Sequence, residues 1–406
     1  MALFRPIGCL IIALLFAFQV KAQTDSLVDK QGFKEVFGIQ KVDTGNVRHG
    51  KYSRYYPDGK LEQEGSYNRG KNTGMWILYH ENGQVRQTLF FADGFLEGPV
   101  EIYYEDGALK KEIPYIGDVV HGVVTSYYPN GQIMEMSTYN KGELNGMAQG
   151  FSDEGVMLYE KYFLKDLEHG PFKTWYRNGY IRSEGSRKEG KYSGPFKSYY
   201  KDFKPGALQK ECTYVDGMLD GDFRGYYPNG NLMVESQYKD NVQVGIFKKY
   251  FGSTKDTTAY NGQQILWRQG VYDQGKKSGR WETWFSNGQL QSEGIYLDGE
   301  YSGEWKVYFH DGSLKHKGLY KKGWAQGEWE FYYPDGTLRK KGSYLDDLKE
   351  GEWKSFYPSG NLQAVTHFKQ ARREGWAIVY SDNGVELGRQ RFEDDQLKES
   401  IKGGTQ

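Results

Sequence analysis

Short runs of aromatic and other apolar residues recur along most of this chain, separated by turn-forming residues. The stretch YSRYYPDGKLEQEGSY, from Tyr52 to Tyr67, is typical, with a Pro-Asp-Gly turn between two strand-like runs. Related stretches return as YYPNGQIMEMSTY, WFSNGQLQSEGIY and YYPDGTLRKKGSY. Aromatic runs around an Asx-Gly pair predict β-hairpins. No segment shows a sustained helical period.

The hairpin pattern repeats at a fixed spacing. Fourteen units begin at a glycine, and eleven of the thirteen intervals between these glycines are 24 residues long. The two exceptions are 27 and 34 residues, and the longer one contains the insertion Phe251 to Gln264. Such a period indicates a repeat architecture in which each unit packs against its neighbours. The starting glycines are Gly50, Gly74, Gly98, Gly122, Gly146, Gly170, Gly194, Gly221, Gly245, Gly279, Gly303, Gly327, Gly351 and Gly375.

The Asx-Gly pairs also predict the strand register. If Asp58 and Gly59 form a two-residue turn with positive φ at both positions, Tyr56 faces Leu61 and Tyr52 faces Gly65. A large ring opposite a glycine covers the bare backbone, so the strand glycines are expected to be structural. The same count in later units pairs Trp281 with Gly294, Trp305 with Gly318 and Trp329 with Gly342.

This register divides the side chains between a packed face and a polar face. Tyr52, Tyr56 and Leu61 are expected on the packed face, and Tyr55 on the polar face. The position of Tyr55 is nevertheless aromatic in all fourteen units. Either the polar face bears a stacked aromatic ladder, or a bulge turns these rings inward. Twelve of them form our candidate interaction surface: Tyr55, Tyr79, Tyr103, Tyr127, Trp175, Tyr199, Tyr226, Tyr250, Trp284, Tyr308, Tyr332 and Tyr380.

One tryptophan per unit recurs in the second half of the chain. A stacking track for a sugar polymer or a peptide is one interpretation. A packed face is the other, and the glycine opposite each ring favours it. The four residues are Trp281, Trp305, Trp329 and Trp353.

These patterns predict an all-β fold, an elongated, twisted single antiparallel sheet of about fourteen tandem 24-residue β-hairpin repeats. Residues 50–392 form the repeat array. Residues 23–49 are expected to be an N-terminal cap or linker, and residues 393–406 a polar C-terminal tail. Residues 1–22 are interpreted as a signal peptide, because Arg5 precedes the apolar run Ile7 to Phe18 and small or apolar residues follow it.

Export places the chain in the periplasm, at the outer membrane or outside the cell. Removal of residues 1–22 leaves Cys212 as the single cysteine, which excludes an internal disulfide. The 53 basic residues equal the 53 acidic ones, so no nucleic-acid partner is expected. Membrane-surface association has weak support, because a basic amphipathic stretch is missing. The oligomeric state is left open.

No motif for catalysis, cofactor or metal binding is present in the sequence. His49, His121 and His169 share a repeat phase, but three and two repeats separate them. At about 4.8 Å per strand these histidines lie roughly 29 and 19 Å apart, too far to share an ion. We therefore predict a protein that is not an enzyme, with no catalytic residues, no cofactor and no metal.

The pattern G-x-W-x-x-Y-Y-x-x-G-x-L-x-x-E-G-x-Y-x-x-G resembles the MORN-repeat variant of bacterial proteins. It is seen in GRWETWFSNGQLQSEGIYLDG, from Gly279 to Gly299, and recurs from about Gly50 to Phe392. Many such proteins carry the label of YwqK-type toxin–antitoxin antitoxins. The resemblance implies an elongated sheet of hairpins that binds partners or acts as a scaffold. It also implies membrane and lipid association as a candidate role.

The expected function is therefore an exported, non-enzymatic repeat scaffold. Its partner is expected to be another protein or an envelope polysaccharide, because tyrosine and tryptophan are favoured at interfaces. One alternative is a carbohydrate- or cell-wall-binding module that uses a Tyr/Trp ladder. The other is an antitoxin-like partner of a toxin, as the family label suggests.

Overall fold

A computed structural model of the chain describes residues 23–252 and 264–404. These residues form β-strands joined by turns, and they contain no helix that is long and apolar enough to cross a membrane. The expected signal peptide lies outside the described residues, as does most of the insertion Phe251 to Gln264.

The chain divides into two compact units, Met1–Val156 and Met157–Gln406. The strands of the first unit are β1 (Gln23–Val28), β2 (Lys34–Val42), β3 (Gly45–Tyr55), β4 (Leu61–Asn68), β5 (Lys71–Tyr79), β6 (Val85–Ala92), β7 (Phe95–Tyr103), β8 (Leu109–Ile116), β9 (Val119–Val120), β10 (Gly122–Tyr127), β11 (Ile133–Asn140) and β12 (Glu143–Phe151).

The second unit begins with β13 (Met157–Leu164), β14 (Leu167–Trp175), β15 (Ile181–Lys188), β16 (Lys191–Tyr192), β17 (Gly194–Tyr199), β18 (Leu208–Val215), β19 (Met218–Tyr226), β20 (Leu232–Lys239), β21 (Val242–Tyr250), β22 (Leu266–Asp273) and β23 (Lys276–Trp284). It ends with β24 (Leu290–Leu297), β25 (Glu300–Tyr308), β26 (Leu314–Lys321), β27 (Trp324–Tyr332), β28 (Leu338–Leu345), β29 (Leu348–Phe356), β30 (Leu362–Lys369), β31 (Arg372–Tyr380), β32 (Glu386–Glu393) and β33 (Gln396–Lys402).

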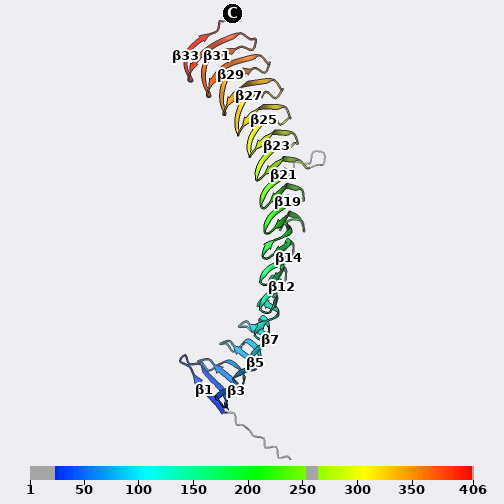
Figure 1. The fold of residues 1–406 in the computed structure, drawn as a ribbon, viewed down its shortest axis with the longest axis vertical. Coiled ribbons are helices and arrows are strands. Elements are labelled where there is room, and N and C mark those ends of the chain that lie inside the picture. The colour runs from blue at the N-terminus through cyan, green and yellow to red at the C-terminus, as the bar shows by residue number, and fades with distance from the viewer. Residues whose placement is uncertain (1–22, 253–263, 405–406) are drawn as a thin grey trace, which may run out of the picture. The chain divides into compact units, whose positions relative to one another are not determined.

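In each unit, strands that follow one another in the chain pair antiparallel and form an open sheet of hairpins (Figure 1). The short strands β9 and β16 are interrupted pieces of the strands that continue as β10 and β17. The predicted fold class, an all-β antiparallel sheet of hairpin repeats, is confirmed.

The segments outside the expected array also join the sheet. In residues 23–49, β1 and β2 form a hairpin whose turn places Gly32 at positive φ. β2 then pairs with β3, and Phe37 is buried beside Tyr52. At the other end, β33 lies within the expected polar tail and pairs with β32.

The turn at the Asx-Gly pairs differs from the predicted two-residue type. The N–H of Tyr56 donates to the carbonyl of Lys60, and the N–H of Gly59 donates to the carbonyl of Tyr56. Of the loop residues 57–59, Gly59 alone has a positive φ. These bonds define a three-residue loop, a type I turn followed by a left-handed glycine. Pro57 explains the choice, because proline favours the second position of a type I turn.

The longer loop changes the register beside the turn. A bulge between Arg54 and Tyr55 places Leu61 opposite Tyr55. The predicted pairing of Tyr56 with Leu61 is therefore wrong. Further from the turn the prediction is confirmed, because Tyr52 pairs with Gly65. The three Trp–Gly pairs are confirmed as well, Trp281 with Gly294, Trp305 with Gly318 and Trp329 with Gly342.

Two-residue turns occur at the opposite end of the strands, where one unit passes to the next. Arg69 and Gly70 both have positive φ, and Asn68 pairs with Lys71 across them. The same two-residue geometry recurs at Asp346 and Asp347, both with positive φ. Type I′ turns match the twist of the flanking strands, which explains the Asp, Asn and Gly preference here.

Each starting glycine forms a bulge that explains why the position is glycine. All fourteen have positive φ. In β25 the residues from Gly303 to Trp305 stand opposite the single residue Gly294, because Ser302 pairs with Ile295 and Lys306 with Glu293. The bulge lets the ring of Trp305 lie directly on Gly294, where a Cβ would overlap it.

Where the lead residue is tryptophan, the ring that covers a strand glycine belongs to the next repeat, whereas the ring nearest to Gly185 is that of its directly paired residue Phe172. The indole N–H of Trp305 donates to the carbonyl of Ile295 at 3.0 Å, which fixes the ring over the preceding strand. The residue two positions after each starting glycine, such as Trp305 after Gly303, is called the lead residue below. Lead tryptophans cover glycine in five units: Trp76 on Gly65, Trp281 on Gly270, Trp305 on Gly294, Trp329 on Gly318 and Trp353 on Gly342.

Candidate interaction surface

The two faces of the sheet carry different side chains. The aromatic face carries the lead residues, and Trp281, Trp305, Trp329 and Trp353 are 3 to 9% exposed there. Closing tyrosines pack edge-on against these rings, as Tyr296 does against Trp305 at 5.2 Å between centroids. The opposite side, called the glutamate face, carries Glu64, Glu184, Glu211, Glu235 and Glu293. The tryptophans thus form a core, and their rings have little free surface for stacking.

The candidate residues of the Tyr55 type lie half-buried on the glutamate face. Among the described residues no ring contact joins two of the twelve, so they do not form a continuous stack. Seven of them instead donate their hydroxyls to glutamates at 2.6 to 2.8 Å. The pairs are Tyr79–Glu64, Tyr103–Glu101, Tyr199–Glu184, Tyr226–Glu211, Tyr250–Glu235, Tyr308–Glu293 and Tyr332–Glu330.

These hydroxyl–carboxylate bonds change the acidity of the tyrosines. Burial, followed by the hydrogen bond to Glu64 and its negative charge, raises the pKa of Tyr79 to about 12. The same causes raise the pKa of Tyr250 to about 12 through Glu235. The hydrogen bond between a tyrosine hydroxyl and a carboxylate fixes both side chains, so these tyrosines stabilise the sheet.

The second residue of most doublets makes a contact that the sequence did not reveal. The hydroxyl of Tyr56 donates to the carbonyl of Tyr79, 23 residues further on, at 2.8 Å. His80 makes the equivalent contact to the carbonyl of Tyr103 at 3.3 Å. The sequence held one signal, since most residues at this position carry a hydroxyl. Tyrosine clips to the next unit also come from Tyr104, Tyr128, Tyr176, Tyr200, Tyr227, Tyr333 and Tyr357.

A row of apolar side chains crosses the glutamate face of the first unit. Met75 pairs with Phe90, and the two are 57% and 45% exposed. Pro99, paired with Pro114, continues the row on the next hairpin. Val123 and Met147 follow, both exposed. These residues are called the apolar row. They are not part of the core, because the lead residues of the same strands fill the core on the other face.

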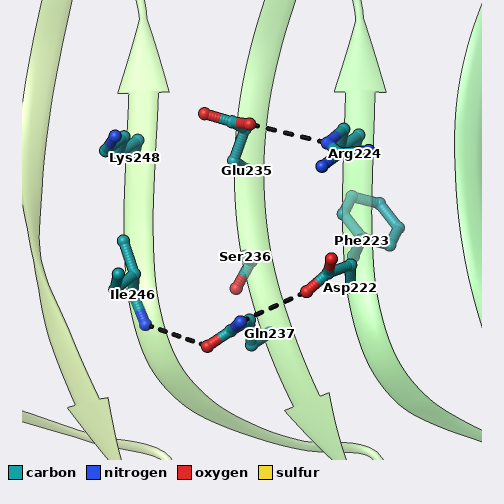
Figure 2. Close-up of a pocket in the computed structure, with 8 residues that line it drawn as sticks. All are labelled: Asp222, Phe223, Arg224, Glu235, Ser236, Gln237, Ile246 and Lys248. Carbon is teal, nitrogen blue, oxygen red and sulfur yellow. Dashed lines mark hydrogen bonds and ion pairs between the residues drawn. The ribbon is translucent and has the colours of Figure 1, made fainter.

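In the second unit the glutamate face carries a charged groove of about 190 Å³ across β19, β20 and β21 (Figure 2). Arg224 lies 3.5 Å from Glu235, and the side-chain amide of Gln237 donates to Asp222 at 3.2 Å. The backbone N–H of Ile246 donates to Gln237 at 3.3 Å. Arg224, Glu235, Gln237 and Asp222 are thus paired within the groove, which is typical of a solvated sheet surface.

The described residues show few groups suited to chemistry. Within 23–252 and 264–404, no three His, Cys, Asp or Glu side chains converge as a metal site. Cys212 is 5% exposed and packs with Phe172 and Phe196. Burial raises the pKa of its thiol, which disfavours the thiolate that a nucleophile needs.

Two crystal structures are among the solved structures to which the chain is similar. One is described as TcdB2-TccC3-Cdc42, with 11% identity, 89% of this chain covered, 23% of the other chain covered and a TM-score of 0.15. The other is TcdB2-TccC3 without hypervariable C-terminal region, with 11% identity, 93% and 24% coverage and a TM-score of 0.16. The chain spans about a quarter of the length of these chains. No curated protein matched the chain.

The family model described as MORN repeat variant matches nine segments of the chain. They are residues 48–69, 72–93, 96–116, 120–141, 219–240, 277–298, 301–322, 325–346 and 349–370. Each segment contains most or all of the strand that carries a lead residue and the strand that follows it, and ends near a two-residue turn. Nine hairpins of this chain therefore match the MORN repeat variant.

Proposed function

We propose that this chain is an exported, non-enzymatic repeat scaffold that binds another protein through the apolar row of its first unit. The apolar row is the observation that carries the proposal. Met75 and Phe90 are about half exposed although the core of the same strands is already filled. Contiguous apolar surface on a soluble protein marks an interaction site. The repeats support a scaffold role, because a repeated sheet offers a long surface.

Photo-crosslinking tests this proposal directly. A photoreactive phenylalanine analogue is placed at Met75 or Val123, and in a control at Glu328, which occupies the repeat position of Met75 in the second unit. The expected result is one discrete crosslinked protein from Met75 and Val123 and none from Glu328. The same crosslink should disappear when Phe90→Asp is added. Equal crosslinking from all three positions, or none from any, would contradict the proposal.

Export is a separate part of the proposal and rests on residues 1–22. The expected outcome is a mature chain that starts at Gln23, detected by mass spectrometry of the protein from envelope or culture fractions. A chain that keeps Arg5 and stays in the cytoplasm would contradict export.

The alternatives remain predictions with less support. A carbohydrate-binding Tyr/Trp ladder needs free ring faces, whereas Trp305 lies on Gly294 and Tyr308 is bound to Glu293. An antitoxin-like role needs a specific toxin partner, which the crosslinking experiment would identify. An envelope polysaccharide as the partner of the apolar row would leave no protein crosslink.

A further inference from the structure

Two residues of the second unit break the repeat pattern at neighbouring positions. The closing residue of the hairpin is aromatic in thirteen of the fourteen repeats and is Arg187 in the sixth repeat. The residue that the next lead residue covers is Lys161 in the fifth repeat. The other repeats have a small, uncharged polar or apolar residue at this position. Local departures from an otherwise consistent pattern are expected at functional sites.

The two cations share one carboxylate on the aromatic face. Lys161 Nζ lies 2.6 Å from Glu168 Oε1, and Arg187 Nε lies 2.6 Å from Glu168 Oε2. Arg187 also donates to the carbonyl of Gly190 at 2.8 Å, and its guanidinium carbon lies 4.1 Å from the ring centroid of Tyr192. Both oxygens of Glu168 are therefore occupied, and its charge is fully used by this pair.

This cluster borders an open cavity of about 450 Å³. The floor consists of small hydroxyl side chains, because Ser183 pairs with both Thr174 and Ser198 on the adjacent strands. Ser198 donates its hydroxyl to the side-chain oxygen of Gln209 at 3.2 Å, and both residues line the cavity. Phe172 closes one side. The lining is polar below and aromatic at the side.

Two further cations line the cavity without a counter-ion. The guanidinium carbon of Arg182 lies 5.9 Å from the ring centroid of Tyr176, and the ammonium of Lys210 lies 5.2 Å from that of Phe196. In the described part of the chain neither has a carboxylate partner. Four cations and one carboxylate, Glu168, give the lining a net charge of 4 − 1, or +3. Lys210 is half-buried and Arg182 is exposed, and cationic groups without a carboxylate partner favour binding of an anion.

We propose that this cavity binds an acidic saccharide. Its carboxylate would lie between Arg182 and Lys210, and its hydroxyls would face Ser198 and Gln209. The cavity is too compact for an extended protein surface, and the hydroxyl floor matches a polyol better than a simple phosphate. The inference deepens the scaffold proposal by giving one surface a ligand class. It uses different residues, on the other face and in the other unit, so either proposal can fail alone.

Calorimetric titration of the full chain tests the site with tri-galacturonate as the probe and maltotriose as its neutral counterpart. Tri-galacturonate should bind, and maltotriose should bind at least about tenfold more weakly, because it offers no carboxylate. In Arg182→Gln/Lys210→Gln the affinity for tri-galacturonate should fall at least about tenfold. Neither residue has an ion-pair partner, so circular dichroism and the melting temperature should stay unchanged.

The matched control is Arg86→Gln/Lys111→Gln. These two residues occupy the same repeat positions in the second and third of the fourteen repeats. Its affinity for tri-galacturonate should equal that of the unchanged chain. Four results would overturn the proposal: no binding of tri-galacturonate, equal binding of maltotriose, equal loss in the control variant, or equally tight binding of triglutamate or inorganic phosphate. The last result would show a general anion site.

Discussion

At the residue scale, the lead residue and the residue it covers are matched in size along the chain. Every lead tryptophan covers a glycine, as Trp329 covers Gly318. Where the covered residue is larger, the lead residue is smaller, as with Leu89 and the following Val100. A protein interior at crystal-like packing density favours such matching, because extra volume must be removed elsewhere. Lys161 under Phe172 is an exception, and its ammonium reaches out to Glu168.

This matching predicts strong coupling between two substitutions. Gly318→Leu alone should destabilise the second unit by about 3 kcal/mol, because the side chain overlaps the ring of Trp329. Trp329→Val alone should cost about 3 kcal/mol through the cavity that it leaves. The double variant reproduces the Leu89 and Val100 pair. It should recover at least about 1 kcal/mol of the summed cost, measured by urea unfolding. Strict additivity would show that the two residues do not share one space.

The tyrosine–glutamate bonds predict a loss of stability in strong alkali. The pKa of Tyr79 is raised from the ordinary value of 10.0 to about 12 by burial and by Glu64. The unfolded chain therefore loses this proton first, so the stabilisation is complete below pH 10 and disappears as the pH rises through 12. Unfolding by urea at several pH values should show this fall. In Tyr79→Phe/Tyr250→Phe the fall should be smaller, and an unchanged slope would contradict the assignment.

The sequence located the Tyr55 position but could not place its ring. Half-burial depends on the bulge beside Tyr55, and that bulge depends on a loop one residue longer than the Asx-Gly pair suggests. Five of the seven hydroxyl partners, such as Glu64 for Tyr79, lie on a neighbouring strand of the preceding repeat. Alternation along one strand therefore predicts the face, whereas the hydrogen bonds need the register between units.

At the element scale, the two ends of each hairpin use different turns. Three-residue loops with one left-handed glycine lie at one end, and two-residue turns with two positive φ angles lie at the other. The second position of the latter is Gly, Asp or Asn in most units but Ala371 in one, at a φ of 66°. Alanine in this conformation places its Cβ against the following carbonyl oxygen, which costs about 1–2 kcal/mol.

Ala371→Gly should therefore stabilise the chain by about 1 kcal/mol, because it removes this strain and exceeds the entropic cost of glycine. Thermal or urea unfolding measures the change. Ala364→Gly in β30 is the matched control and should destabilise, since a strand position gains nothing from glycine. Destabilisation by both variants would show that Ala371 is not strained.

At the scale of the whole molecule, each unit consists of hairpins that contact mainly their neighbours in sequence. The bulged strand, the lead residue and the tyrosine clip all act over one repeat, as between Trp305 and Gly294. In such a chain stability is the sum of repeat terms and nearest-neighbour terms. The repeat number should then be adjustable without loss of the fold.

Deletion of residues 303–326 tests this expectation. It removes one 24-residue period and joins Ser302 to Gly327, the equivalent of Gly303. The shortened chain should keep its β-sheet circular dichroism and elute as a soluble species. Deletion of residues 303–314 removes half a period and reverses the strand order, so it should aggregate. Aggregation of both variants would contradict nearest-neighbour stability.

The repeat period and the Asx-Gly pairs were sufficient to predict the hairpins, the antiparallel sheet and the Tyr52–Gly65 register. The positively charged cavity could not be predicted from the net charge of the chain. Its cations come together only when three hairpins are folded, and they are Lys161, Arg182, Arg187 and Lys210. In the sequence these four residues are spread over three successive repeats, among other lysines and arginines. Strand pairing places them around one cavity, and no spacing rule along the chain marks it.

The two departures from the 24-residue period occur at the same end of the hairpins. One adds three residues between Tyr200 and Leu208, and the other adds ten between Tyr250 and Leu266. The first leaves the clip intact, since Tyr200 still donates to the carbonyl of Tyr226 at 2.7 Å. Length variation is thus confined to the three-residue loops, while the two-residue turns keep their size. For protein engineering, these loops are grafting points where foreign peptides could be displayed one repeat apart along a constant frame.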